Sequence, residues 1–210
     1  MPPYVLMSRV LVADWSVLRF YFLSFRFTVS EGVSGSSLAK SSVSRNIKKS
    51  IIESYPLLEP SEDQSHLDVI LGDKKQPLYV IKCHDKVQMV AINKEPKFFC
   101  THEEQWLPIL RLLHQYPDML PTVQVDRGAI RFVLKGADIM APGLTSAGGD
   151  LSNDLPADTY VAIKAEGMKR ILAIGKTVMS TADMKRLNKG TAITNLHFLN
   201  DGLWNTAQIE

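Results

Sequence analysis

Apolar side chains recur at every fourth position between residues 41 and 56, a spacing that predicts an amphipathic helix. Residues four apart lie one turn apart on the same helix face. The apolar positions of this face are Val43, Ile47, Ile51 and Tyr55. Ser42 or Ser44 is suited to cap the start of the helix, and Pro56 ends it.

The pattern then changes to short apolar runs separated by turn residues, which predicts strands. The runs are LYVIKC, VQMVAI and KFF, at residues 78–83, 87–92 and 97–99. They are followed by WLPILRLLHQYP, in which Pro108 suits the first turn of a short helix. A helix, a small sheet and a second helix predict an α+β domain over residues 41–116.

A different arrangement begins at residue 117. In VDRGAIRFVLKGAD, Asp126 is a suitable N-cap and Gly136 a suitable C-terminal cap, with about nine helical residues between them. The apolar stripe of this helix is Ile130, Val133 and Leu134. ADIMAPG then predicts a strand that stops at the turn pair Pro142-Gly143.

Further strand patterns follow at TYVAIKA, RILAIGKTVM and TAITNLHFL. Glu166-Gly167 is a hairpin signal between the first two, and STADMKRLNKG predicts a capped helix before the third. The turn Asn200-Asp201-Gly202 follows the last strand. Five or six short strands with two small helices predict a compact β-barrel over residues 117–205.

The first 40 residues do not fit either domain. They are apolar and aromatic, but charged residues interrupt every apolar run, so neither a membrane span nor a secretory signal fits. We expect an unstructured extension or an incorrectly chosen start, with a mitochondrial presequence as the alternative. VSGSSLAKSS, at residues 33–42, reads as a flexible linker.

Charge and cysteine content limit the kinds of nucleic-acid and metal site that the chain can contain. The net charge is +2, and residues 41–116 and 117–210 each carry ten basic and ten acidic side chains, so any contact with nucleic acid must come from local clustering. Cys83, His84, Cys100 and His102 are zinc-ligand types. Neighbouring strand residues point to opposite faces, so Cys83 and His84 cannot easily share one ion, and we expect no metal.

Several phrases of the chain resemble known families. The series Asp126-x-Gly128-Ala129, Lys135-Gly136-Ala137-Asp138, Pro142-Gly143 and Lys189-Gly190 resembles a PUA domain, the RNA-binding pseudobarrel found with pseudouridine synthases and archaeosine transglycosylases. LRLLHQYP, QVDRGAIRFVLKGADIM, PGLTS and LHFLNDGLW are similar to the malignant T-cell-amplified sequence family. This resemblance implies an α+β fold in which an N-terminal pre-PUA domain precedes a PUA pseudo-β-barrel.

The resemblance also implies an RNA site at the helix–strand junction of the PUA domain. Arg127, Arg131 and Lys135 are spaced by four and could line up against phosphates. Gly136 and Gly143 would let RNA approach the backbone closely. The expected RNA-binding residues are Arg127, Arg131, Lys135, Gly136, Ala137, Asp138, Ile139 and Gly143.

The function that the resemblance implies is that of a cytoplasmic, non-enzymatic translation factor acting in reinitiation, tRNA release and recycling. Its implied partners are the small ribosomal subunit, with its rRNA and tRNA, and density-regulated protein as a heterodimer partner. No cofactor, small-molecule substrate or membrane is expected. Two alternatives remain open: the accessory module of an RNA-modification enzyme, and a mitochondrial PUA-type RNA-binding protein.

Overall fold

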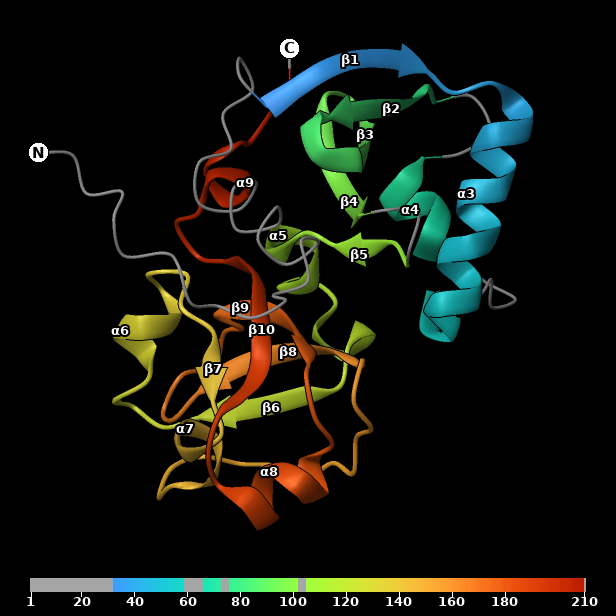
Figure 1. Ribbon diagram of the computed structural model, residues 1–210. Coiled ribbons are helices and arrows are strands. Elements are labelled where there is room, and N and C mark those ends of the chain that lie inside the picture. Colours follow the sequence, from blue (N-terminus) through green and yellow to red (C-terminus); the bar gives the residue numbers. More distant parts are fainter. Residues whose placement is uncertain (1–31, 59–65, 73–75, 102–104, 210) are drawn as a thin grey trace, which may run out of the picture.

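The computed structural model describes residues 32–58, 66–72, 76–101 and 105–209. Two sheets lie one above the other in Figure 1, the N-terminal sheet at the top and the C-terminal sheet below it. Each is five-stranded, with the orders β1-β2-β3-β4-β5 and β6-β8-β9-β10-β7. The two-domain α+β architecture expected from the sequence is confirmed.

The N-terminal sheet is antiparallel throughout. Its strands are β1 (Val33–Leu38), β2 (Leu78–Cys83), β3 (Val87–Ile92), β4 (Glu95–Thr101) and β5 (Leu107–Pro108). Its helices are α3 (Ser41–Ser54), α4 (His66–Leu71) and α5 (Leu110–Leu113), with single 3-10 turns at Pro56–Leu58, His84–Lys86 and Pro117–Met119.

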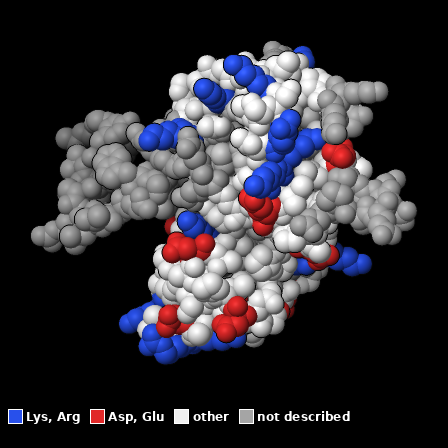
Figure 2. Space-filling view, turned by 90° about the vertical axis from the view of Figure 1, so that its right-hand side faces the viewer, with Lys and Arg blue, Asp and Glu red and all other residues white. Residues whose placement is uncertain are grey.

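Helix α3 lies along one side of this sheet, as Figure 1 shows. Ile47, Ile51 and Tyr55 of the predicted stripe are buried, whereas Val43 is exposed. The expected serine cap is wrong: Lys40 occupies the N-cap position, and no side chain caps the helix. Basic residues of α3 lie on the outer face, where Figure 2 shows Lys and Arg side chains gathered over the N-terminal domain.

The linker expected at residues 33–42 is wrong for most of its length. Val33–Leu38 forms β1, which pairs with β2 along Gly35 to Leu38 opposite Lys82 to Tyr79. Small polar residues gave no strand signal because both faces of an exposed edge strand can be polar. The N-terminal domain therefore begins before residue 41, and the remainder of the expected extension, residues 1–31, lies outside the described residues.

The segment after β4 also differs from the prediction. Pro108 lies in β5 rather than in the first turn of a helix, and α5 has only four residues. Apart from Arg111, residues 107–113 are all apolar, and they are buried. A nearly continuous apolar run does not show which of its residues are helical.

The cysteines of the possible metal site are both buried in the N-terminal domain. Burial raises the pKa of the Cys83 thiol to about 12. His84 is exposed, and His102 lies outside the described residues. Within the described ranges, no cluster of three His, Cys, Asp or Glu residues could hold a metal ion, and no helix has the length and apolar composition of a membrane span.

The C-terminal sheet is mixed. β6 (Thr122–Val125) runs parallel to β8 (Tyr160–Ala165), and the other pairs are antiparallel: β8 with β9 (Ala173–Thr177), β9 with β10 (Thr191–Phe198), and β10 with β7 (Ile139–Met140). The helices are α6 (Ile130–Val133), α7 (Pro142–Thr145), α8 (Thr181–Leu187) and α9 (Gly202–Asn205). Ser180 caps α8 by accepting a hydrogen bond from the amide of Asp183, as its sequence predicts.

The two domains share one apolar core. Ala162, Ile171, Ile174, Leu196, Leu203 and Ile209 of the C-terminal half pack into the core cluster of the N-terminal domain. Polar contacts reinforce this junction. Arg111 of α5 donates to the carbonyl oxygens of Trp204 and Thr206, and the His114 ring bonds the Ile171 carbonyl at 2.8 Å.

The side chain of Asp201 makes three hydrogen bonds at the junction. It was expected only as a turn residue, but it is buried and caps α9 by accepting from the Trp204 amide at 2.7 Å. Its other oxygen contacts His197 Nδ1 at 2.6 Å and accepts from the Phe198 amide at 2.9 Å. One side chain thus satisfies three groups at the end of β10.

Replacing Asp201 with alanine should therefore be strongly destabilising. Two amides and a buried imidazole would lose their partner, so we expect the free energy of unfolding to fall by roughly 3 kcal/mol or more. Urea denaturation followed by circular dichroism measures this change. Asp118→Ala, at an exposed position, should change stability by no more than about 0.5 kcal/mol; equal effects of the two substitutions would contradict the assigned role.

Candidate RNA-binding site

A groove of about 640 Å³ opens beside α6 in the C-terminal domain. The residues that line it come from the β6–α6 connection, from α6 itself, and from β7 with the start of α7. They are Asp126, Gly128, Ala129, Arg131, Phe132, Val133, Ala137, Asp138, Ile139, Met140 and Gly143.

The walls of the groove are apolar and partly aromatic. The side chains of Phe132 and Met140 are 50% and 49% exposed, which is unusual for residues of their size. The guanidinium carbon of Arg131 lies 4.7 Å from the centroid of the Phe132 ring. A guanidinium plane and an aromatic face at one opening can stack with the flat face of a nucleobase.

Asp126 supplies one carboxylate to the groove. Its Oδ1 accepts from the Ala129 amide at 2.8 Å, and its Oδ2 accepts from the Ser146 hydroxyl at 2.6 Å. The bond from Ser146 is the main cause that lowers the pKa of Asp126, and the amides of Ala129 and Gly128 contribute further. Asp126 therefore carries a full negative charge at neutral pH.

Asp138 supplies a second carboxylate and is tied to the sheet. Its Oδ1 accepts from the backbone amide of Asn195 on β10 at 3.0 Å. The buried side-chain amide of Asn195 donates in turn to the carbonyls of Val133 and Ala137, at 3.1 and 3.2 Å. These three bonds fix the segment between α6 and β7 against β10.

The structure brings five of the eight expected RNA-binding residues into the groove: Arg131, Ala137, Asp138, Ile139 and Gly143. Arg127, Lys135 and Gly136 are not among its lining residues. Arg127 and Lys135 are exposed next to it, one before and one after α6, whereas Gly136 is buried.

The predicted alignment of Arg127, Arg131 and Lys135 along one helix is wrong. The helix was expected to have about nine residues, but α6 has four, and the residues on either side of it form turns. Asp126 accepts a hydrogen bond from the Ala129 amide in the turn before the helix, and the helix ends at Val133, with Leu134 as its C-cap. Of the three cations, only Arg131 belongs to α6.

Gly136 ends this segment in the left-handed conformation, with φ of +78°. Its amide donates to Val133 and that of Ala137 donates to Phe132, at 2.9 and 3.0 Å, the bonding pattern of a Schellman cap. A Cβ at this position would lie 2.9 Å from the Phe198 ring. The expectation that Gly136 leaves space for RNA is therefore wrong, since its missing side chain would point into the protein.

Gly143 differs from Gly136. A Cβ there would meet Ala129 Cβ at 3.4 Å and Asp126 Oδ2 at 4.0 Å, which are ordinary contact distances. It lies in α7, so the turn expected at Pro142-Gly143 is instead the first turn of a short helix. Gly143 does border the groove, as expected for a position of close approach.

Phe132 and Met140 were missed by the sequence analysis, and Asp126 was assigned only a capping role. Phe132 lies outside the apolar stripe of Ile130, Val133 and Leu134, so a helical projection already places a large aromatic side chain on the exposed side. The exposed position of Phe132 on the helix was therefore the sequence signal for a binding surface. No comparable signal marks Met140, which follows a buried isoleucine in a two-residue strand.

Comparison with known proteins identifies both domains. A Pre-PUA-like domain family matches residues 27–117, and a PUA domain family matches residues 121–199. Malignant T-cell-amplified sequence 1 of Rattus norvegicus is 45% identical over 181 residues, which cover 85% of this chain and 94% of the relative. The chain belongs to the malignant T-cell-amplified sequence family. Translation machinery-associated protein 20 of Schizosaccharomyces pombe is 43% identical over 181 residues, which cover 86% of this chain and 97% of that relative.

Solved structures confirm the fold of this family member. A hypothetical protein from the archaeon Pyrococcus horikoshii superposes with a TM-score of 0.61 at 23% identity, over 82% of this chain and 99% of that one. A conserved PUA domain protein from Thermoplasma acidophilum gives a TM-score of 0.58 at 18% identity, over 82% of this chain and 99% of that one. The pre-PUA match from residue 27 also agrees with the inclusion of β1 in the N-terminal domain.

The two glycines predict different effects of alanine. Gly136→Ala should lower the free energy of unfolding by roughly 2–4 kcal/mol, because a left-handed residue would gain a Cβ that collides with Phe198. Gly143→Ala should change stability by less than about 1 kcal/mol, since its Cβ meets no close neighbour. Thermal melts of the two variants test this; equal shifts in Tm would refute the assignment.

Proposed function

We infer that the protein is a non-enzymatic, ribosome-associated factor of the translation machinery that binds RNA through the groove beside α6. Its relatives in Schizosaccharomyces pombe and Eremothecium gossypii bear the name translation machinery-associated protein 20, and its C-terminal half is a PUA domain. The observation that carries the proposal is the exposed Phe132–Arg131 pair at the opening of a mainly apolar groove.

The groove would take bases, with the phosphates outside it. Two carboxylates, Asp126 and Asp138, line the groove and would repel a phosphate placed there. The cations Arg127 and Lys135 are exposed on either side of α6 and are suited to the backbone. A base stacked on Phe132 would leave its edge facing the carboxylates, which accept hydrogen bonds from exocyclic amino groups.

The finer assignment follows the family. We propose that the small ribosomal subunit with its rRNA and tRNA is the physiological target, and that density-regulated protein is a heterodimer partner. The processes would be reinitiation, tRNA release and recycling, in the cytoplasm. Belonging to a family whose relatives associate with the translation machinery supports this placement over a mitochondrial one.

The alternative of an RNA-modification accessory module has less support. The matched region covers 94% and 97% of the lengths of two relatives, and the residues that line the groove include no nucleophile paired with a base. Asp126 and Asp138 both accept hydrogen bonds from backbone amides, and the bonds to Asp126 lower its pKa, so it is not suited to act as a proton donor at neutral pH. The arrangement suits recognition.

Reversing the charge of Arg131 should weaken RNA binding. Arg131→Glu removes a stacking cation and adds a third carboxylate to the groove, so we expect at least tenfold weaker co-sedimentation with the small ribosomal subunit at low salt. Lys135→Glu, beside the groove, should have a smaller effect. It removes one phosphate contact, so the slope of log K against log salt should fall by about one. Thermal melts check that both variants fold.

Lys185→Glu is the matched control, because Lys185 is exposed on α8 and outside this groove. It makes the same charge change and should bind like the wild type. If Arg131→Glu and the wild type bind the subunit equally at both salt concentrations, the RNA surface lies elsewhere.

The carboxylates also predict a base preference. Cytosine presents an amino donor where uracil presents a carbonyl, so a cytidine trinucleotide should bind about fivefold more tightly than a uridine trinucleotide. Asp138→Asn should reduce this preference, because an amide can also donate to the uracil carbonyl. Fluorescence anisotropy with labelled trinucleotides measures it; an unchanged preference in Asp138→Asn would exclude Asp138 as the reading group.

A further inference from the structure

The turn between β8 and β9, residues 166–170, carries a second cluster of exposed side chains beside the groove. We propose that this segment, here called the basic turn, is a separate contact for single-stranded RNA that continues the path of the backbone out of the groove. The proposal rests on the proposed function of the groove and extends it to a longer RNA.

Charge and exposure single out the basic turn. All five of its residues are exposed, and Met168 is 48% exposed. Lys169 and Arg170 are adjacent cations, and among the residues that the structure describes no ion pair engages either of them. Glu166 is the one acidic residue of the turn and its carboxylate accepts from the Arg127 amide, so the turn keeps a net charge of +1. The two cations, with an exposed thioether beside them, can contact phosphates and a base or ribose together.

The basic turn is joined directly to the edge of the groove. The amide of Glu166 donates to the carbonyl of Val125 at 2.9 Å, and the amide of Arg127 donates to the Glu166 carboxylate at 3.3 Å. Val125 and Arg127 flank Asp126, which lines the groove. A strand of RNA leaving the groove past Asp126 would therefore meet Arg127 first and the basic turn next.

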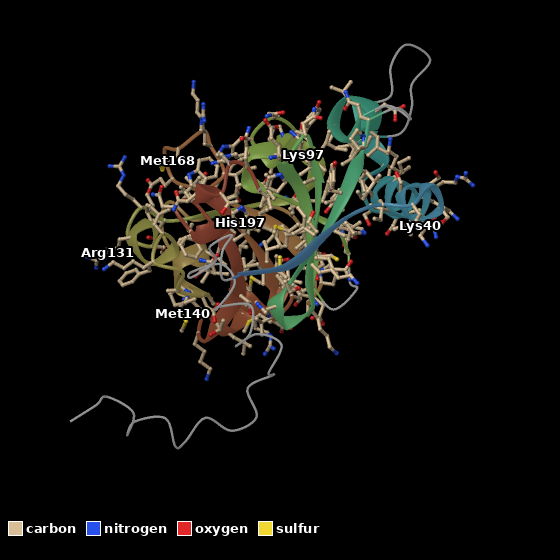
Figure 3. All side chains as sticks on the ribbon, turned by 90° about the horizontal axis from the view of Figure 1, so that it is seen from above. Lys40, Lys97, Arg131, Met140, Met168 and His197 are labelled. Carbon is tan, nitrogen blue, oxygen red and sulfur yellow. The ribbon has the colours of Figure 1, made fainter. Side chains whose placement is uncertain are left out.

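The same arrangement is visible in the whole molecule. Met168, Arg131 and Met140 lie along one side in Figure 3, whereas Lys40 lies on the opposite side. Met140 borders the groove on one side of Arg131, and Met168 follows on the other. The basic turn thus extends the same surface.

Contacts within the hairpin and with Arg127 fix the conformation of the turn. Gly167 has φ of +74°, and the amide of Met168 donates to the Ala165 carbonyl at 3.0 Å, which closes the hairpin. A Cβ on Gly167 would lie 3.5 Å from the Arg127 guanidinium. Pairing of β8 with β9 and the bond to Val125 of β6 hold the turn in place with Gly167 beside Arg127, so Lys169 and Arg170 belong to an anchored hairpin instead of a free loop.

Continuity with the groove favours RNA over an acidic peptide as the occupant. An isolated pair of cations would serve either, but here they follow Arg127 and an aromatic groove on one surface. An exposed aromatic ring in the groove and cations beyond it can contact the bases and the phosphates of one single strand.

RNA length separates the two sites. Binding of labelled cytidine oligonucleotides, a trinucleotide and one of about nine nucleotides, is measured by anisotropy over a range of salt concentrations. In Lys169→Ala/Arg170→Ala, the slope of log K against log salt should fall by about 1.4 for the longer RNA, the value for two lost single-strand contacts. The slope for the trinucleotide should not change.

The matched control is Lys40→Ala/Arg45→Ala, which removes one Lys and one Arg at exposed positions, with Lys40 on the opposite side of the molecule. It should leave both slopes unchanged. An unchanged slope for the longer RNA in the basic-turn variant, or an equal fall for both RNAs, would overturn the proposal. Failure of the wild type to bind the trinucleotide would instead count against the groove, and a fall in slope for the longer RNA would still support the turn.

Discussion

The side-chain amide of Asn195 holds the groove beside α6 in shape. It is buried on β10 and donates to the carbonyls of Val133 and Ala137, and its backbone amide bonds Asp138. Because α6 is too short to be stable by itself, its C-terminal end needs these tertiary bonds. The opening between Phe132 and β7, and the direction of the Asp138 carboxylate, both follow from them.

Strand β10 can serve both domains because its register shifts. The pairing with β9 is irregular between Asn195 and His197, a β-bulge that inserts one residue. Ile193 and Phe198 pack in the core of the C-terminal domain, whereas Leu196 packs in the core that the two domains share. His197 meets the edge of Phe99 from the N-terminal domain at 5.8 Å between ring centroids. The strand that positions the groove is thus also the strand that joins the domains.

Sequence patterns predicted the long amphipathic and β-branched elements well. Helix α3, the strands β2, β3, β8 and β10, and the cap of α8 lie where the patterns place them. Two elements that the patterns did not predict, β1 and α9, are set by tertiary contacts instead of local preference. Small polar residues form β1 because β2 supplies its partners, and α9 forms because the buried Asp201 caps it.

The groove was predictable in location but not in detail. The spacing Asp126 to Gly136 located the helix–strand junction, and the left-handed Gly136 is where the cap was expected. Which side of that junction faces outward depends on Phe198, sixty-two residues along the chain from Gly136. No local pattern contains that contact. The sequence could therefore predict Gly136 as a helix cap, but it could not show that the missing side chain of Gly136 would point toward Phe198 instead of the groove.

The buried junction has a consequence for any larger assembly. Arg111 bonds the carbonyls of Trp204 and Thr206 and lies over the Trp204 ring, and the Ile209 amide donates to Lys94 at 2.8 Å. The end of the C-terminal domain is therefore fastened to the N-terminal sheet by a shared apolar core and by backbone bonds. Changing the angle between the domains would expose that core and break these bonds, at a cost comparable to the stability of a domain. Under the proposed function, an RNA held in the groove would therefore fix the orientation of α3 and of the whole N-terminal sheet. A partner bound to that sheet would be placed at a defined distance and angle from the RNA, which is the property that a two-domain adaptor on a large ribonucleoprotein requires.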